Sequence, residues 1–205
     1  MNRAPRAPTR RASIAAACCA LAACAHQPDG LDDGFDFSER QSRISAVADW
    51  DLRGRMTVAT PERSHRAGVR WQQRGDRLEL TVRGLLGARS FRIEGGPESL
   101  TVTEGGDTRI LNDPEVELSR EFGWWLPVTS LEYWVLGQPD ADFELRSRRG
   151  ADGTLRTLDQ RDWLIRYEEY QLAAGLLVPR TIILRHDTLE LTLNITRWEP
   201  VAAEP

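Results

Sequence analysis

Residues 189–195, LELTLNI, alternate apolar and polar side chains along their whole length. Successive side chains of a β-strand point to opposite faces of a sheet, so this stretch predicts a strand with one apolar and one wet face. The same period of two recurs at residues 50–58, 69–71, 78–82, 91–93, 100–102, 143–145, 163–167 and 182–184, with short polar or glycine-containing breaks between them. We therefore predict an antiparallel sheet of about ten or eleven strands.

In the middle of the chain the apolar period changes from that of a strand to that of a helix. Asp113 and Pro114 are suited to be the N-cap and first residue of a helix that ends at Gly123. A second short helix is predicted over residues 130–136. Another short helix, opened by a capping box at Ser38, precedes the first strand, and we expect it to cover an open edge of the sheet.

A sheet of this size with one apolar face must curve and bury that face. The helices inserted in mid-chain are the natural cover for it. The predicted fold is therefore mainly β, an incomplete, half-open antiparallel β-barrel with a helical lid over its mouth.

The first residues have the three parts of an export signal. A cationic start is followed by an apolar stretch over residues 12–23 and then by Cys24. The stretch is too short for a membrane-spanning helix, which needs about 20 apolar residues. The tetrapeptide L-A-A-C at residues 21–24 resembles the bacterial lipobox, although an alanine-rich signal that happens to contain cysteines would look similar. We predict a cleaved lipoprotein signal over residues 1–23 and a lipid attached to Cys24.

Composition suggests a simple domain organisation. Residues 24–37 are rich in Pro, Gly and Asp and are expected to form a flexible tether, followed by one domain over residues 38–200 and a tail at 201–205. Loss of residues 1–23 removes four of the 27 cationic residues and none of the 31 acidic ones, leaving a net charge of about −8. This charge argues against nucleic-acid binding. Ala25 follows the lipidated cysteine, which by the rules of bacterial lipoprotein sorting implies the periplasmic face of the outer membrane.

Several short motifs occur in a fixed order along the predicted mature chain. They are Arg53-Gly54, Trp71-Gln72-Gln73, Leu86-Gly87, Leu126-Pro127 with Leu131 and Trp134, Gly137-Gln138-Pro139, Trp163 with Tyr167 and Tyr170, residues 177–179, and Trp198. Each motif is weak alone, but their order and spacing behind a lipobox resemble the LolB family of outer-membrane lipoprotein receptors. The resemblance implies a LolA/LolB-like half-barrel.

The resemblance also implies a function and a site. Members of the family accept lipoproteins from the periplasmic carrier LolA, shelter the acyl chains in an apolar cavity and place the lipoprotein in the outer membrane. The inward-facing positions that we expect to line this cavity are Leu52, Met56, Val69, Trp71, Leu80, Val82, Phe91, Ile93, Leu131, Trp134, Trp163, Ile165, Leu191 and Leu193. Trp50 and Trp198 are further candidates, and core packing explains any of the tryptophans equally well.

Leu85 and Leu86 stand at a glycine-flanked turn between two predicted strands, where a polar tip is usual. From the residues alone, both leucines could fold back onto the sheet. The resemblance implies instead that Leu86, which precedes Gly87, projects from the loop and takes part in membrane insertion. Leu85 replaces the proline expected before that leucine, so the rigidity of the loop is open.

The main alternatives are an enzyme and a lipoprotein of the same fold that binds another lipid or a glycolipid. The sequence has no G-x-S-x-G, S-x-x-K or H-E-x-x-H motif, and its three histidines are too scattered for a metal site. We therefore expect no catalysis, cofactor or metal. We also expect the protein to be a monomer. Periodicity does not separate a protein-acceptor from a glycolipid binder.

Overall fold

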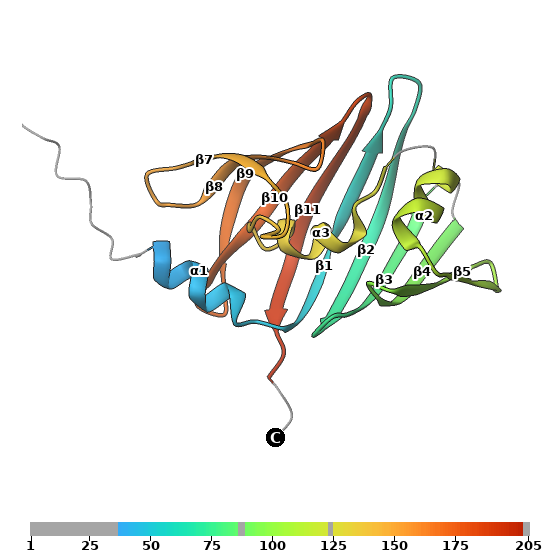
Figure 1. Ribbon diagram of the computed structural model, residues 1–205, viewed down its shortest axis with the longest axis horizontal. Helices are drawn as coiled ribbons and strands as arrows, with labels where there is room; N and C mark the ends of the chain where they lie inside the picture. The colour runs from blue at the N-terminus through green and yellow to red at the C-terminus, as the bar shows by residue number, and fades with distance from the viewer. Residues whose placement is uncertain (1–36, 86–88, 123–124, 203–205) are drawn as a thin grey trace, which may run out of the picture. The chain divides into compact units, whose positions relative to one another are not determined.

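The computed structural model describes residues 37–85, 89–122 and 125–202, which form one antiparallel sheet and three helices (Figure 1). The strands are β1 (Asp49–Ala59), β2 (Ser64–Arg74), β3 (Arg77–Leu85), β4 (Arg89–Gly96), β5 (Ser99–Glu104), β6 (Asp107–Leu111), β7 (Leu145–Arg149), β8 (Leu155–Gln160), β9 (Trp163–Ala173), β10 (Leu176–His186) and β11 (Leu189–Pro200). The helices are α1 (Phe37–Ser45), α2 (Pro114–Phe122) and α3 (Val128–Trp134). The predicted mainly β fold with helices inserted in mid-chain is confirmed.

The order of the eleven strands is β6-β5-β4-β3-β2-β1-β11-β10-β9-β8-β7. The first and last strands therefore pair in the middle of the sheet, and each half of the chain runs outward to its own edge. Because β6 and β7 lie at opposite edges, the segment between them must cross a face of the sheet. That segment holds α2 and α3, which lie in front of the curved sheet in Figure 1.

The start of α2 follows the sequence prediction. The Val116 amide donates to the Asp113 carboxylate at 3.3 Å, and the amides of Asn112 and Asp113 both donate to Glu117. These bonds satisfy donors that the first helical turn would otherwise leave free. Leu118, on the inner side of α2, is fully buried in a small core with Leu100 and Val102.

The prediction that the first helix covers a sheet edge is wrong. The edges are β6 and β7, whereas α1 packs beside β10. Arg40 donates from Nε and Nη2 to the Leu177 carbonyl at 3.1 and 2.8 Å, and Arg43 donates to the Gly175 carbonyl at 3.1 Å. Carbonyls at the end of the β9–β10 hairpin thus attract the two arginines and hold α1 there.

None of the helices within the described ranges has the length and apolar character needed to cross a membrane.

The Arg53-Gly54 motif has a clear structural basis in the central strand pair. The β1–β11 register shifts between Arg53 and Gly54, and a Cβ atom at Gly54 would collide with the Asn194 carbonyl oxygen. A glycine is required here because two backbones approach each other closely.

We predict that Gly54→Ala lowers the free energy of unfolding by about 1–3 kcal/mol, since the central strand pair must shift to admit a methyl group. Urea unfolding monitored by tryptophan fluorescence measures this change. Gly68→Ala on β2 is the matched control, because a Cβ atom there meets nothing within 4 Å. Equal unfolding midpoints for the two variants would contradict the explanation.

Candidate functional site: an apolar cavity beneath the lid

A cavity of about 970 Å³, counting the space at its opening to solvent, lies between the sheet and the helical insertion. Every side chain that lines it is apolar: Met56, Val58, Val69, Trp71, Leu80, Val82, Phe91, Ile93, Leu126, Leu131, Trp134, Val135, Ile182, Leu184, Leu191 and Leu193. Such a lining suits hydrocarbon and offers nothing to a charged group.

Eleven of the fourteen residues expected from the sequence line this one cavity. They are Met56, Val69, Trp71, Leu80, Val82, Phe91, Ile93, Leu131, Trp134, Leu191 and Leu193. Five strands of the sheet, β1 to β4 and β11, bring nine of them together, and α3 supplies the other two.

The other three, Leu52, Trp163 and Ile165, point to the same face but do not line the cavity. Their exposed fractions are 0%, 1% and 0%, and they pack in the main core beside it. Leu52, for example, is paired with Trp71 on one side and Trp198 on the other. Strand periodicity identifies the inward face, but where along a strand the core ends and the cavity begins depends on the lid.

Sequence reasoning missed five lining residues: Val58, Leu126, Val135, Ile182 and Leu184. Val58, Ile182 and Leu184 continue the alternating pattern and could have been included on that signal. Val135 follows α3, and Leu126 precedes it in the Leu126-Pro127 motif. Val135 lies within residues 130–136, which the sequence predicts as a helix, so the helical period could have included it. Leu126 is placed by the path of the chain between α2 and α3, for which periodicity has no signal.

The two tryptophans of the cavity expose only their apolar surfaces to it. The Trp71 indole donates to Gln73 Oε1 at 2.9 Å, and the Trp134 indole donates to Gln160 Oε1 at 2.9 Å. Both glutamines are themselves buried. Because the indole N–H groups are satisfied outside the cavity, a hydrocarbon ligand would leave no donor unpaired. Trp50, Trp163 and Trp198 belong to the core instead.

The sequence model of the LolB family, described as outer membrane lipoprotein LolB, matches residues 48–198. The chain belongs to the LolB family. It is 31% identical over 182 residues to the outer-membrane lipoprotein LolB of Chromohalobacter salexigens, covering 87% of this chain and 85% of that protein. It is 32% identical over 184 residues to that of Nitrosococcus oceani, covering 87% of this chain and 92% of that protein.

Solved structures support the fold of this LolB-family chain. A LolA superfamily protein from Nitrosomonas europaea superposes with a TM-score of 0.50 at 10% identity, covering 82% of this chain and 93% of its own. A DUF1329 family protein from Desulfovibrio piger gives a TM-score of 0.52 at 9% identity, covering 84% and 93%. At such low identity the likeness concerns the fold alone.

Three of the LolB-family motifs meet where the lid returns to the sheet. Gly137 has a φ of +71°, and a Cβ atom there would lie 3.1 Å from the Tyr170 hydroxyl and 3.0 Å from Pro179. The Tyr167 hydroxyl donates to the Trp134 carbonyl at 3.1 Å, at the end of α3. Burial raises the pKa of Tyr167 well above its ordinary value, so this hydroxyl stays a donor. The motifs thus dock the end of the lid on β9 and β10.

Gln160 and Asp140 fasten the segment that follows α3. Gln160 Oε1 accepts from the Asp140 amide at 3.0 Å as well as from Trp134, and Gln160 Nε2 donates to the carbonyls of Asp140 and Phe143. The Ser130 hydroxyl donates to the Asp140 carboxylate at 2.6 Å. A buried polar network therefore ties α3 to the end of β8.

Arg161 connects both lid helices to the turn between β8 and β9. Its guanidinium donates to both carboxylate oxygens of Glu115 on α2, at 2.6 and 3.1 Å, and to the hydroxyls of Thr129 and Ser130 on α3. It also stacks on Phe143, with 4.1 Å from Cζ to the ring centroid. Side-chain exposure is only 11% for Arg161 and 16% for Glu115, so water screens the pair weakly. We call this contact the lid clamp.

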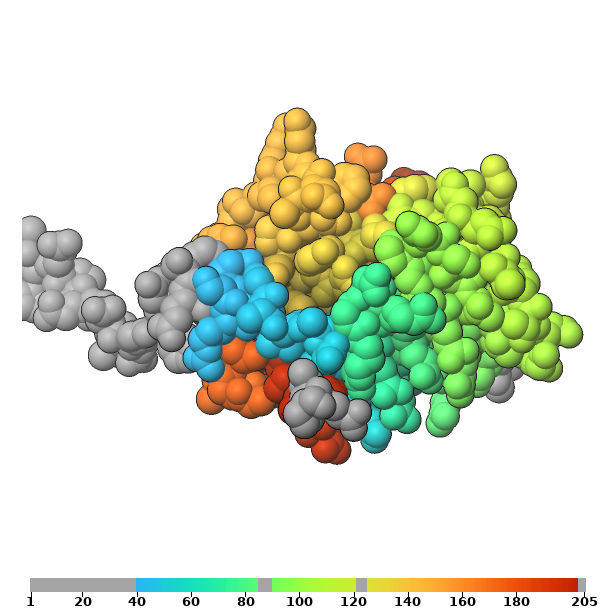
Figure 2. Space-filling model, turned by 60° about the horizontal axis from the view of Figure 1, so that its bottom comes forward, coloured from blue at the N-terminus to red at the C-terminus, as the bar shows by residue number. Residues whose placement is uncertain are grey.

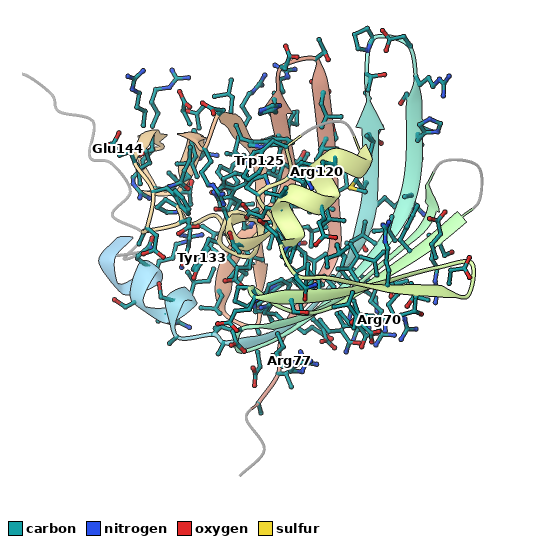
Figure 3. The ribbon with its side chains drawn as sticks, turned by 45° about the vertical axis from the view of Figure 1, so that its right-hand side comes forward. Arg70, Arg77, Arg120, Trp125, Tyr133 and Glu144 are labelled. Carbon is teal, nitrogen blue, oxygen red and sulfur yellow. The ribbon has the colours of Figure 1, made fainter. Side chains whose placement is uncertain are left out.

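Some residues singled out in the sequence lie outside the described parts: Cys24, Leu86 and Trp124. The described chain ends β3 at Leu85 and resumes with β4 at Arg89. Trp125 is partly buried against the main core, and the Arg161 guanidinium lies 5.6 Å from its ring centroid (Figure 3). Within the described ranges, no three His, Cys, Asp or Glu side chains are grouped to hold a metal ion.

We predict that Arg161→Met loosens the lid selectively. Loss of the guanidinium leaves Glu115 nearly buried and unpaired, which should cost about 3 kcal/mol of stability. Hydrogen exchange followed by mass spectrometry should show faster exchange in α2 and α3 with the central strands unchanged. Arg185→Met is the control, because the Arg185–Glu190 pair is 46% and 37% exposed and contributes little. Indistinguishable exchange in the two variants would refute a clamp.

Proposed function

We propose that this chain is an outer-membrane lipoprotein receptor, anchored on the periplasmic face through lipid on Cys24 after removal of residues 1–23. It accepts lipoproteins from the periplasmic carrier LolA, holds their acyl chains in the cavity beneath the lid, and inserts them into the outer membrane. It acts as a monomer, with residues 24–37 as a tether. The observation that carries the proposal is the wholly apolar lining of the cavity in a chain of the LolB family.

The energetic demand of this task is large and simple. Each CH₂ group of an acyl chain left in water costs about 0.8 kcal/mol, so a lipoprotein crosses water only with its chains covered. The wholly apolar lining of the cavity supplies such cover. The transfer makes and breaks no covalent bond, and its direction requires only that the next site bind the chains more favourably. Catalytic residues and cofactors have no part in it.

The lid clamp gives the cavity a way to admit cargo of varied size. Leu131 and Trp134 line the cavity from α3, while Thr129 and Ser130 of the same helix hold the clamp. A bulky cargo that displaces α3 must break these hydrogen bonds, each of which contributes about 1 kcal/mol. Burying further CH₂ groups offsets that cost.

We predict that Met56→Glu abolishes cargo uptake while Thr57→Glu does not. Met56 lines the cavity, whereas its neighbour Thr57 points to the other face of β1, so only the first change buries a carboxylate in the apolar lining. The measurement is transfer of a radiolabelled lipoprotein from purified LolA to the purified protein, with at least a tenfold loss expected for Met56→Glu. Failure of the unaltered protein to take lipoprotein, together with retained glycolipid binding, would favour the glycolipid alternative.

A second prediction concerns delivery. We propose that Leu86, with Leu85 at the end of β3, takes part in inserting the lipoprotein into the membrane. Leu86→Glu should then leave lipoprotein acceptance intact and reduce delivery to liposomes about tenfold or more, because a carboxylate resists entry into hydrocarbon. Glu62→Gln, at the turn between β1 and β2, should not alter delivery. Unchanged delivery by Leu86→Glu would exclude this role.

The anchor has its own test. Cys24→Ala removes the sulfur to which lipid attaches, so the protein should move from the outer-membrane fraction to the soluble periplasmic fraction on cell fractionation. Sedimentation of the variant with the outer membrane would show that another feature holds the protein there.

A further inference from the structure

A second recess lies on the side of α3 that faces away from the acyl cavity. It consists of two adjoining hollows of about 990 and 580 Å³, counting space open to solvent, and Glu132 and Tyr133 border both. The larger hollow is also lined by Leu78, Leu100 and Phe143, and the smaller one by Ile44, Trp50 and Gln138. We call the two hollows the outer groove.

The outer groove is separate from the cavity, with which it shares no lining residue. In Figure 2, which brings the lower end of the molecule forward, the yellow lid segment is set back between the blue α1 region and the turquoise end of the β2–β3 hairpin. Tyr133, labelled in Figure 3, is 39% exposed. The groove is therefore open to a ligand that never enters the apolar cavity.

The lining of the outer groove is acidic. It includes five carboxylate residues, Asp76, Glu115, Glu132, Asp140 and Asp142, and no arginine. Arg161 neutralises Glu115, but the other four have no ion pair within the described residues. Burial and the nearby charges of Asp140 and Asp76 raise the pKa of Glu132. The negative charges thus reinforce one another around Glu132, where a cation would relieve the repulsion.

An incompletely bonded amide adds a second, independent sign of a ligand. Gln138 borders the smaller hollow, and the residue is 5% exposed. Its Oε1 accepts from the Ser45 hydroxyl at 3.3 Å, but its Nε2 has no hydrogen-bond partner. A buried amide nitrogen without a partner costs about 1–3 kcal/mol, and an acceptor such as the backbone carbonyl of a bound peptide would remove that cost.

The smaller hollow combines these polar groups with apolar walls. One wall of the hollow is apolar and consists of Ile44 in α1, Val47 just after it, Trp50 and Leu136. Glu132 and Gln138 supply the polar groups. The Glu132 carboxylate is held in place by Gln73, whose Nε2 donates to Oε2 at 2.8 Å. An arginine or lysine side chain matches such a site, because its aliphatic stem packs on apolar walls while its cationic head meets a fixed carboxylate.

The composition of the two ends of this chain does not suit the groove. Residues 24–36 contain four aspartates and no arginine, and residues 203–205 contain a glutamate and no arginine. Like charge therefore disfavours both segments. The complementary partner is another polypeptide.

We propose that the outer groove binds a cationic peptide segment of a partner protein, with an arginine or lysine stem between α1 and α3 and its charged head on Glu132. Apolar neighbours of that cation pack against Leu78, Leu100 and Phe143 in the larger hollow. The site shares no lining residue with the acyl cavity and adds a place where protein, not lipid, is recognised.

Fluorescence anisotropy of two labelled peptides tests the proposal. The purified full chain is titrated with Gly-Leu-Arg-Ala-Leu-Arg-Gly and with the same peptide carrying glutamine in place of both arginines. The arginine peptide should bind at least tenfold more tightly. Glu132→Gln, which keeps an acceptor for Gln73, should lower that affinity about tenfold. Asp142→Asn, at an exposed position, should do the same. Glu62→Gln, at the β1–β2 turn and outside the lining of the groove, is the control for the loss of one negative charge.

Three outcomes would overturn the proposal: equal binding of the two peptides, affinity unchanged by both Glu132→Gln and Asp142→Asn, or an equal loss in Glu62→Gln. Competition by a fatty acid adds a further check. If fatty acid displaces the arginine peptide and neither Glu132→Gln nor Asp142→Asn weakens its binding, the peptide occupies the acyl cavity and the outer groove is not its site. Retained binding in the presence of fatty acid, with loss in the two groove variants, supports it.

Discussion

The pairing of β1 with β11 is the constraint from which the rest of the architecture follows. It joins the first and last strands in the centre of the sheet. The first half of the chain therefore ends at one edge, with β6, and the second half begins at the opposite edge, with β7. The connection between those edges has to cross a face, and the apolar face is the one that gains by being covered. A lid is therefore a consequence of strand order. Gly54 allows β1 and β11 to pair, because a larger residue would not fit where the two backbones approach each other.

The lid is held by apolar packing of Leu118 and Trp134 and by polar contacts at its margins, and it covers a cavity whose lining has no polar side chain. Gln160 lies at the end of β8 and Arg161 in the turn that follows, and both contact the lid helices from the side. The Gln160 amide and the Arg161 guanidinium therefore stay outside the apolar cavity. The indoles of Trp71 and Trp134 follow the same rule. This separation keeps the cavity free of unpaired polar groups.

The sequence predicts those features that depend on the regular spacing of apolar residues along a strand or helix. Alternation identified the inward faces of β1 to β4 and β11, so most cavity residues were recognised, and Asp113-Pro114 marked the start of α2. Sequence reasoning failed where the answer depends on contacts between distant segments. Leu52 and Met56 share a face, yet only the lid decides which lines the cavity. Arg161 stands in a two-residue turn with a φ of +54°, and no local pattern marks it as the partner of Glu115, 46 positions away. The place of α1 likewise depends on carbonyls of the β9–β10 hairpin.

Helix α3 concentrates these constraints in seven residues. Leu131 and Trp134 face the cavity. Thr129 and Ser130 accept hydrogen bonds from Arg161. Glu132 and Tyr133 border the outer groove. So short a helix has little stability of its own and takes its position from its neighbours on all sides. A molecule that binds on one side of α3 therefore acts on the same rigid element as a molecule on the other. If cargo moves this helix, it also changes the outer groove, and a partner bound in that groove affects, by reciprocity, the free energy of opening the cavity.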